Sequence, residues 1–217
     1  MTQRAIIFDL DGTLIDSESL AFVAWERALK QFNRVFKRED ESLVLGIDLT
    51  GAIANIKRHF QLTDSIETIY QVLGREWTTL TAQGLPTMPG VHDLLDALDQ
   101  RQIQWGVATN SDLSYAVQHL SHVGLAKRAQ AIVGQDMVPN PKPAPDVFAE
   151  CARLMGFEPV NCIAVEDSRV GHRAAKAAGM TVVVVLEGAT SAEFPHADLI
   201  LPNLHAFREQ IDLILNR

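Results

Sequence analysis

A chain of 217 residues with 47% hydrophobic and 21% charged residues has the composition of a folded globular protein, large enough for one domain with a small insert. Its net charge of -8 argues against a nucleic-acid partner, and no run approaches the roughly 18 apolar residues of a membrane span, so we expect no membrane partner. Met1–Arg4 leave no room for a signal peptide, and Cys151 and Cys162 are not at metal spacing. We expect a cytoplasmic protein with reduced cysteines, as a monomer or weak homo-oligomer.

The first predicted element is a buried strand that ends in two carboxylates. Residues 6–8 form an apolar run, and Asp9 and Asp11 follow it before Gly12. Alternation along a strand places both carboxylates on one side, a few ångströms apart. Such a pair requires a cation or a shared proton. Mg²⁺ suits this position because it takes oxygen ligands, keeps several waters and can also hold a substrate phosphate.

Three helical patterns follow the first strand. Apolar residues recur every three or four positions from Phe22 to Phe36, from Leu49 to Phe60 and from Ile66 to Leu80, and we expect them to form a core. An all-helical block of about 70 residues between two strands is too long for a crossover helix. We therefore predict a small all-helical cap domain over residues 16–86, inserted into a core domain that comprises residues 1–15 and 87–217.

From Val91 onward, predicted strands and helices alternate along the chain. The strands are 104–108, 131–133, 162–165, 182–186 and 199–201, and the helices are 91–98, 113–123, 145–155, 170–178 and 204–215. Repeated strand-helix units predict an α/β fold with a doubly wound parallel sheet that is covered on both faces. Ligands of such sheets bind beyond the carboxyl ends of the strands.

Polar segments lie beyond the ends of these strands. Residues 109–111 offer hydroxyl and backbone N–H donors for phosphate, although the pattern alone is more typical of a helix-capping turn. Lys142 stands between two prolines that restrict its backbone and fix the direction of its ammonium group. Glu166 and Asp167 follow a third apolar run and add carboxylates to a metal site.

These segments resemble, in order, the four motifs of a known family. Residues 9–13, 107–111, 140–146 and 165–168 are similar to the motifs of the haloacid dehalogenase (HAD) superfamily, in the group of β-phosphoglucomutase and phosphoglycolate phosphatase. The resemblance spans almost the whole chain. It implies a Rossmann-like core with a helical cap inserted after the first motif. It also implies a Mg²⁺-dependent phosphatase whose substrate is a small phosphorylated metabolite, with a sugar phosphate or a related phosphorylated acid as the preferred class.

The resemblance, together with the chemistry of phosphoryl transfer, suggests a role for each motif residue. Asp9 is expected to be the nucleophile that forms an aspartyl-phosphate, and Asp11 the general acid and base. Lys142 is expected to be catalytic and to bind the phosphate. The remaining assignments are Thr109, Asn110 and Ser111 for phosphate binding, and Asp9, Asp11 (through its backbone carbonyl), Asp167 and Glu166 (directly or through a water) for Mg²⁺.

Two alternatives to the phosphatase stay open. A phosphomutase of this superfamily uses a cap histidine and an arginine after a cap glycine. Counting from the shared motifs places Ala21 at the histidine position and Leu49, within Gly46-Ile47-Asp48-Leu49, at the arginine position. Neither side chain can replace those groups, which favours hydrolysis. A shifted alignment of the cap would instead bring Lys57 or Arg58 to such a position. The other alternative is a catalytically silent regulatory protein that binds phosphorylated ligands. It would be expected to lack some motif residues, and here all are present.

Overall fold

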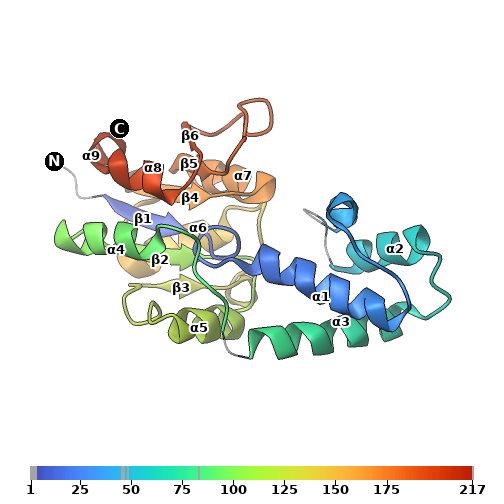
Figure 1. The fold of residues 1–217 in the computed structure, drawn as a ribbon. Helices are drawn as coiled ribbons and strands as arrows, with labels where there is room; N and C mark the ends of the chain where they lie inside the picture. Colours follow the sequence, from blue (N-terminus) through green and yellow to red (C-terminus); the bar gives the residue numbers. More distant parts are fainter. Residues whose placement is uncertain (1–3, 45–46, 48, 83, 217) are drawn as a thin grey trace. The chain divides into compact units, whose positions relative to one another are not determined.

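The computed structural model of the protein describes residues 4–44, 47, 49–82 and 84–216. Two compact units divide the chain: a helical unit, Ser17–Leu85, and an α/β unit made of Met1–Asp16 and Pro86–Arg217. Figure 1 shows the elements of both units in sequence colours. Among the residues described, no helix combines the length and the apolar character needed to cross a membrane.

The α/β unit is built on a parallel sheet, six-stranded in the described part of the chain (Figure 1). Its strands lie in the order β3 (Ile132–Val133), β2 (Trp105–Ala108), β1 (Ala5–Phe8), β4 (Cys162–Glu166), β5 (Thr181–Val185) and β6 (Leu199–Leu201). All neighbouring pairs are parallel. The strand order reverses between β1 and β4, which is the topological switch point of a doubly wound sheet. The predicted α/β fold is confirmed.

Helices cover this sheet. They are α4 (Val91–Gln100), α5 (Leu113–His122), α6 (Asp146–Met155), α7 (Arg169–Ala177), α8 (Leu204–Glu209) and α9 (Ile211–Leu215), with short 3₁₀ turns at Gln135–Met137 and Pro159–Asn161. α6 and α7 pack on the sheet face that carries Ile7, Ala164 and Val182, and the buried free thiols of Cys151 and Cys162 lie in the same cluster. Successive strand residues point to opposite faces, so Phe8 and Trp105 meet edge to face on the other side.

The prediction of a single closing helix over 204–215 was wrong. The backbone breaks at Gln210 between α8 and α9. The apolar period nevertheless continues across the break, because Leu204, Phe207, Ile211 and Ile214 are all buried. The pattern therefore located the buried face correctly, but it does not encode the interruption of the backbone.

The helical unit contains α1 (Ser17–Gln31), a 3₁₀ helix (Arg38–Leu43), α2 (Leu49–His59) and α3 (Ile66–Thr81). Trp25, Leu29 and Ile69 belong to a core of its own, which shares no residue with the cluster beneath α6 and α7. The first helix was predicted to reach Phe36 but ends at Gln31. Asn33 adopts a left-handed conformation (φ 55°) and turns the chain back.

Several aromatic and apolar residues depart from the predicted helix faces. Phe36 is buried as predicted, although it lies beyond the end of α1. Leu49, Ile66 and Tyr70 were expected on apolar faces but are exposed. Leu49 and Ile66 begin their helices, where a side chain has fewer neighbours to pack against. Helical periodicity therefore overestimated the apolar core at the starts of α2 and α3 and at Tyr70 within α3.

Candidate active site

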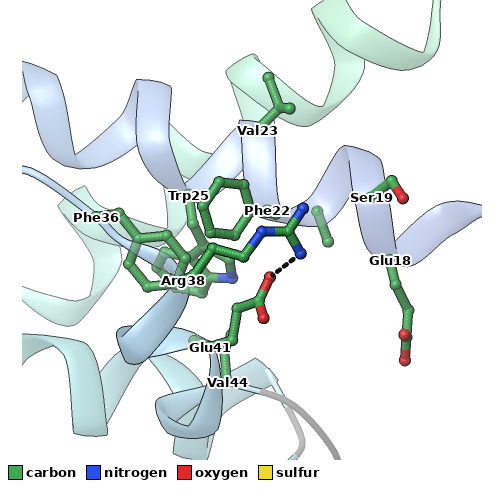
Figure 2. Close-up of a pocket in the computed structure, with 10 residues that line it drawn as sticks. Glu18, Ser19, Phe22, Val23, Trp25, Phe36, Arg38, Glu41 and Val44 are labelled. Atoms are coloured by element: carbon green, nitrogen blue, oxygen red, sulfur yellow. Dashed lines mark hydrogen bonds and ion pairs between the residues drawn. The ribbon is translucent and has the colours of Figure 1, made fainter.

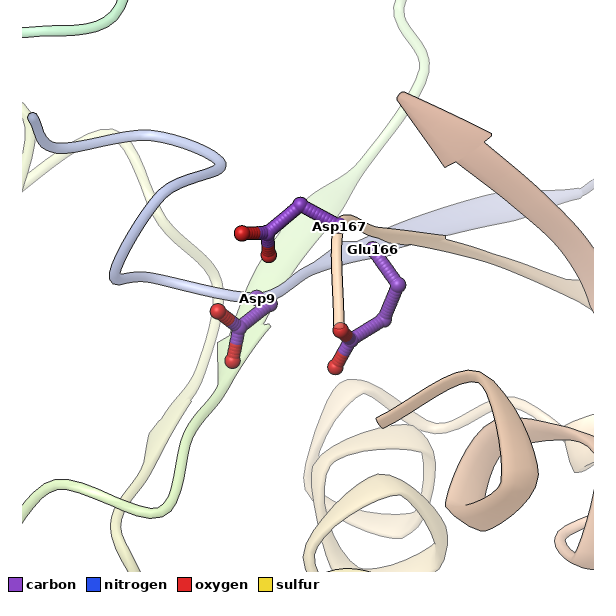
Figure 3. Close-up of side chains that lie close together, drawn as sticks. All are labelled: Asp9, Glu166 and Asp167. Carbon is purple, nitrogen blue, oxygen red and sulfur yellow. The ribbon is translucent and has the colours of Figure 1, made fainter. Parts of the chain in front are cut away.

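Three carboxylates gather at the carboxyl ends of β1 and β4 (Figure 3). The two strands are paired in parallel, with Phe8 opposite Val165, so the residues that end or follow them meet at one sheet edge. Asp9 follows β1, Glu166 ends β4 and Asp167 comes next. One oxygen from each lies within 4.8 Å of the others. This edge is the switch point of the strand order, where open α/β sheets bind their ligands.

Lys142 connects two of these carboxylates. Its Nζ lies 2.5 Å from Asp9 Oδ1 and 2.6 Å from Glu166 Oε1, and its side chain is only 3% exposed. The ammonium also lies 4.7 Å from the centre of the Phe148 ring. The loop that carries Lys142 is held by Asn110, whose side chain accepts a hydrogen bond from the Lys142 N–H (2.8 Å) and donates one to the Lys142 carbonyl (3.1 Å). Lys142 is therefore fixed at both its backbone and its ammonium group.

Glu166 is fully buried and both of its oxygens accept hydrogen bonds. Oε1 accepts a hydrogen bond from the Lys142 ammonium, and Oε2 accepts hydrogen bonds from the Ser168 N–H (3.2 Å) and hydroxyl (2.8 Å). The same Ser168 hydroxyl caps α7 by accepting the Gly171 N–H at 2.9 Å. Gly171 has no side chain because a Cβ there would lie 1.7 Å from Glu166 Oε1. The start of α7 is thus shaped around one carboxylate.

Asp167 is oriented by the turn that follows β1. The buried hydroxyl of Thr13 donates to Asp167 Oδ1 at 3.0 Å. Gly12 has φ +80°, a conformation that favours glycine, and a Cβ at this position would lie 2.2 Å from Asp167 Oδ2. The glycine after the second aspartate therefore permits both the turn and the close approach of Asp167.

Burial and charge act in opposite directions on the central ion pair. Burial raises the pKa of Asp9 to about 7, against the lowering effect of the Lys142 ammonium and with a further rise from Glu166. Burial alone would lower the pKa of Lys142, but the carboxylates of Asp9 and Glu166 outweigh it and hold that pKa above its usual value. Lys142 is therefore charged at neutral pH.

The carboxylate of Asp11 lies against the segment predicted to bind phosphate. Ser111 Oγ donates to Asp11 Oδ2 at 2.7 Å, and the Tyr115 hydroxyl donates to Oδ1 at 3.2 Å. The Ser111 N–H, a predicted phosphate donor, donates to Thr109 Oγ1 at 3.0 Å within its own turn. Thr109 is 2% exposed and extends the pairing of β2 with β3 through its N–H.

Hydrogen bonds, ion pairs or close carboxylate oxygens connect every predicted site residue to at least one other. Asp9, Lys142, Glu166 and Asp167 form one cluster, to which the side chain of Asn110 is attached through the Lys142 backbone. A second set joins the Asp11 carboxylate to Ser111 and, through Ser111, to Thr109.

Sequence reasoning missed four contributions to this site: the hydroxyls of Thr13, Ser168 and Tyr115, and the side chain of Asn110. Ser168 carried a usable signal, since a serine between a strand and a helix is a typical N-cap. Thr13 stood within a motif but had no partner that spacing could reveal. Tyr115 lies within α5, where only the folded structure shows that it reaches Asp11.

The charge of the cluster fits a divalent cation. Three carboxylates face a single ammonium, and the excess negative charge lies where Asp9 and Glu166 are buried. Carboxylate oxygens are the ligands that hard divalent cations prefer. Because both Glu166 oxygens already accept hydrogen bonds, Asp9 and Asp167 are the carboxylates better suited to direct ligation.

The helical unit has a hollow of its own, of about 390 Å³ (Figure 2). The Arg38 guanidinium lies over the Phe22 ring, 5.2 Å from its centre, and pairs with Glu41 at 3.3 Å. Glu18 and Ser19 also line it. None of the predicted site residues lines this hollow, which combines charged groups with aromatic faces.

Comparisons with known proteins identify the family. A family model described as haloacid dehalogenase-like hydrolase matches residues 6–185. Hexitol phosphatase B of Escherichia coli (strain K12) is 31% identical over 209 residues, covering 92% of each chain, and β-phosphoglucomutase of Bacillus subtilis (strain 168) is 29% identical over 220 residues, covering 95% of this chain and 96% of the other. The crystal structure of CbbY from Rhodobacter sphaeroides in complex with phosphate is 28% identical, with a TM-score of 0.74 over 95% of this chain and 96% of that one. The resemblance seen in the four motifs is confirmed, and the chain belongs to the haloacid dehalogenase-like hydrolase family.

Proposed function

We propose that this enzyme, a phosphoric monoester hydrolase, is a Mg²⁺-dependent phosphatase that acts on a small phosphorylated carbohydrate through an aspartyl-phosphate on Asp9. The observation that carries the proposal is the buried Asp9 carboxylate, held by Lys142 beside Glu166 and Asp167, with Asp11 two residues further on. The substrate class is supported by the relatives, whose names include hexitol phosphatase and phosphorylated carbohydrates phosphatase.

In the first step, an Asp9 oxygen attacks phosphorus and the bond from phosphorus to the substrate oxygen breaks. Lys142 holds Asp9 in place and offsets negative charge as the phosphoryl group arrives. Asp11 supplies the proton that turns the departing oxygen into an alcohol. The phosphate oxygens would be bound by Lys142 and by the segment from Thr109 to Ser111, whose N–H groups and hydroxyls are donors.

In the second step, water attacks the phosphorus of the aspartyl-phosphate. Asp11, now ionised, takes the proton from this water, and the bond from phosphorus to Asp9 breaks. Free phosphate leaves and both aspartates return to their starting states. The same carboxylate therefore acts once as an acid and once as a base.

Mg²⁺ would be held by Asp9, Asp167 and the Asp11 backbone carbonyl, with Glu166 acting through a water. When bound, it neutralises charge on the phosphate and keeps Asp9 ionised. Glu166 and Ser168 meanwhile keep Lys142 and the start of α7 in position.

A phosphomutase is less well supported by this chain. Ala21 and Leu49, at the positions where mutases of the superfamily carry a histidine and an arginine, line an apolar hollow of about 320 Å³ together with Tyr70 and Trp77. Lys57 donates to the backbone carbonyls of Leu62 and Asp64. Gly46 and Asp48 of the corresponding loop lie outside the described residues. Neither Ala21 nor Leu49 can supply the imidazole or the guanidinium that such mutases use, which favours hydrolysis.

Phosphate release from a substrate panel tests the proposal. The panel comprises hexose phosphates, hexitol phosphates, phosphoglycolate and nucleoside monophosphates, each with Mg²⁺ and with excess chelator. We expect one carbohydrate phosphate to dominate, and turnover to stop with chelator or in Asp9→Asn. Asp93→Asn, an exposed residue in the first turn of α4, is the matched control and should keep wild-type turnover. Turnover that persists in chelator would contradict the metal requirement.

Product analysis separates the phosphatase from the mutase. The enzyme is incubated with β-glucose 1-phosphate, a trace of the bisphosphate and Mg²⁺. We expect free phosphate to form faster than glucose 6-phosphate. The opposite order would replace the phosphatase by a mutase.

A further inference from the structure

We propose that Tyr115, which lies outside the family's motifs, is a positioning residue that aims Asp11 for proton transfer. This inference rests on the proposed function. It assigns to a side chain on α5 the task of holding the general acid and base beside the phosphate-binding segment. Its basis is the hydrogen bond from the Tyr115 hydroxyl to Asp11 Oδ1.

Asp11 has two hydroxyl donors on its carboxylate, one for each oxygen. Ser111 binds Oδ2 at 2.7 Å and Tyr115 binds Oδ1 at 3.2 Å. Two donors from different positions fix the plane of a carboxylate, whereas one donor would leave it free to rotate. Asp11 itself lies directly before Gly12, which has φ +80°, in the turn that follows β1.

Both donors are themselves held rigidly. The Ser111 N–H donates to Thr109, which is buried at the end of β2. The Tyr115 ring meets the His119 ring edge to face at 4.3 Å, one helical turn further along α5, and His119 is 2% exposed. Burial and the charge of Asp11 raise the pKa of the Tyr115 hydroxyl, so it remains a donor throughout the neutral range.

This orientation keeps Asp11 separate from the carboxylate cluster. Within the described residues, the grouped carboxylates are Asp9, Glu166 and Asp167, and the Asp11 side chain is not among them. It faces Ser111 instead, on the segment expected to bind the transferring phosphate. A carboxylate held there can reach the substrate oxygen that leaves phosphorus.

The first step depends on this position to an extent set by the leaving group. When the bond from phosphorus to an alkyl oxygen breaks, Asp11 must deliver a proton, because an alkoxide is a poor leaving group. When the leaving group is 4-nitrophenolate, a weak base, the same bond breaks without a proton. The formation of the phosphoryl bond to Asp9 is otherwise identical.

The test compares kcat/KM for an alkyl phosphate and for 4-nitrophenyl phosphate in wild type, Tyr115→Phe and Tyr70→Phe. kcat/KM reports the steps up to the first irreversible bond cleavage. We expect Tyr115→Phe to lower kcat/KM for the alkyl phosphate by about tenfold or more, which is a fraction of the effect of a general acid. For the aryl phosphate, kcat/KM should fall by less than about twofold. Tyr70→Phe removes the same hydroxyl from an exposed position and should change neither value.

The possible outcomes distinguish a positioning role of Tyr115 from a merely structural one. Equal losses for both substrates would show a merely structural role, and a gain for the alkyl phosphate would mean that Tyr115 holds Asp11 in an unproductive position. No change for either substrate would also overturn the inference. If wild type hydrolyses neither substrate with Mg²⁺, the proposed function fails instead. Thermal unfolding of Tyr115→Phe serves as a folding control.

Discussion

At the scale of single residues, the site depends on a buried charge pattern with Lys142 at its centre. Its ammonium contacts the carboxylates of Asp9 and Glu166, both of which are buried. Buried charges are expensive unless they are paired, so the removal of one partner costs more than the pair itself contributes. The sequence indicated Lys142 through its flanking prolines, but it could not show that Glu166 is the second partner.

We predict that Lys142→Met destabilises the metal-free protein by about 3–5 kcal/mol, because it leaves two buried carboxylates without a counter-charge. Lys176→Met is the matched control. Lys176 pairs with Asp198 at 2.8 Å at the surface, and its loss should cost no more than about 1 kcal/mol. Urea unfolding of both variants in chelator measures the difference. Equal stability of the two variants would contradict the role given to Lys142.

The raised pKa of Asp9 predicts that protons compete with Mg²⁺. Burial moves this pKa from 3.8 to about 7 in the metal-free protein, so below pH 7 the carboxyl holds a proton that a cation must displace. The apparent affinity for Mg²⁺ should therefore be nearly constant above pH 8 and fall by up to about tenfold per pH unit below pH 7. Calorimetric titration with Mg²⁺ at pH 8, 7 and 6 checks this. An affinity independent of pH down to pH 5 would contradict it.

At the scale of elements, α7 begins where β4 ends, and the junction is built around Glu166. Ser168 caps the helix and binds Glu166 with the same hydroxyl. The backbone of Gly171 approaches that carboxylate so closely that no Cβ fits. Glu166 cannot move aside without releasing Lys142 or Ser168. A glycine in the first turn of a helix is thus explained by packing and not by its conformation.

We predict that Gly171→Ala destabilises the protein by about 1–3 kcal/mol and lowers kcat, since the added methyl group displaces Glu166 and with it Lys142. Gly74→Ala makes the same change inside α3, where nothing lies within 4 Å of the new Cβ. It should stabilise the protein by up to about 1 kcal/mol through helix propensity. Thermal unfolding of both variants gives the comparison. A destabilised Gly74→Ala beside an unaffected Gly171→Ala would refute this explanation.

Local sequence patterns predicted most helices and strands, but not the contacts between residues that are far apart in the chain. The strands followed from short apolar runs bounded by turn residues, because a strand buried on both faces has no alternating polar positions. Local patterns failed where the backbone changes direction while the buried face continues, as at Asn33 and Gln210. The strand order and the contact of Tyr115 with Asp11 depend on residues far apart in sequence, so no local period encodes them. The candidate site residues were predicted through the resemblance of four motifs to a known family, whereas the hydroxyls that contact them were not predicted.

At the scale of the whole molecule, the described residues include an apolar core in each unit, and these two cores share no residue. One lies under α6 and α7 in the α/β unit, and the other joins α1, α2 and α3. Each unit therefore has its own source of stability. Separate cores allow the two units to open locally with different free energies.

We predict that damage to one core stays within its unit. Leu29→Ala removes a fully buried side chain of α1 at a cost of about 2–5 kcal/mol. It should accelerate amide hydrogen exchange in α1 and α3 and leave β1 and β4 unchanged. Ile7→Ala, which truncates a fully buried residue of β1 in the core beneath α6 and α7, should do the reverse. Equal acceleration throughout the chain in either variant would show that the two units unfold as one.

Asp9 is proposed to carry the phosphoryl group during turnover, and the variant Asp11→Asn should trap the group there. An amide at this position cannot take the proton from water, so the second step should slow while 4-nitrophenolate still leaves without help. With 4-nitrophenyl phosphate and Mg²⁺, we expect a burst of one 4-nitrophenolate per enzyme. Mass spectrometry after acid quench should then find one phosphoryl group on the peptide that contains Asp9, and neither signal in Asp9→Asn/Asp11→Asn. A burst without a phosphoryl group on that peptide, or near wild-type turnover by Asp9→Asn, would show that Asp9 is not the nucleophile.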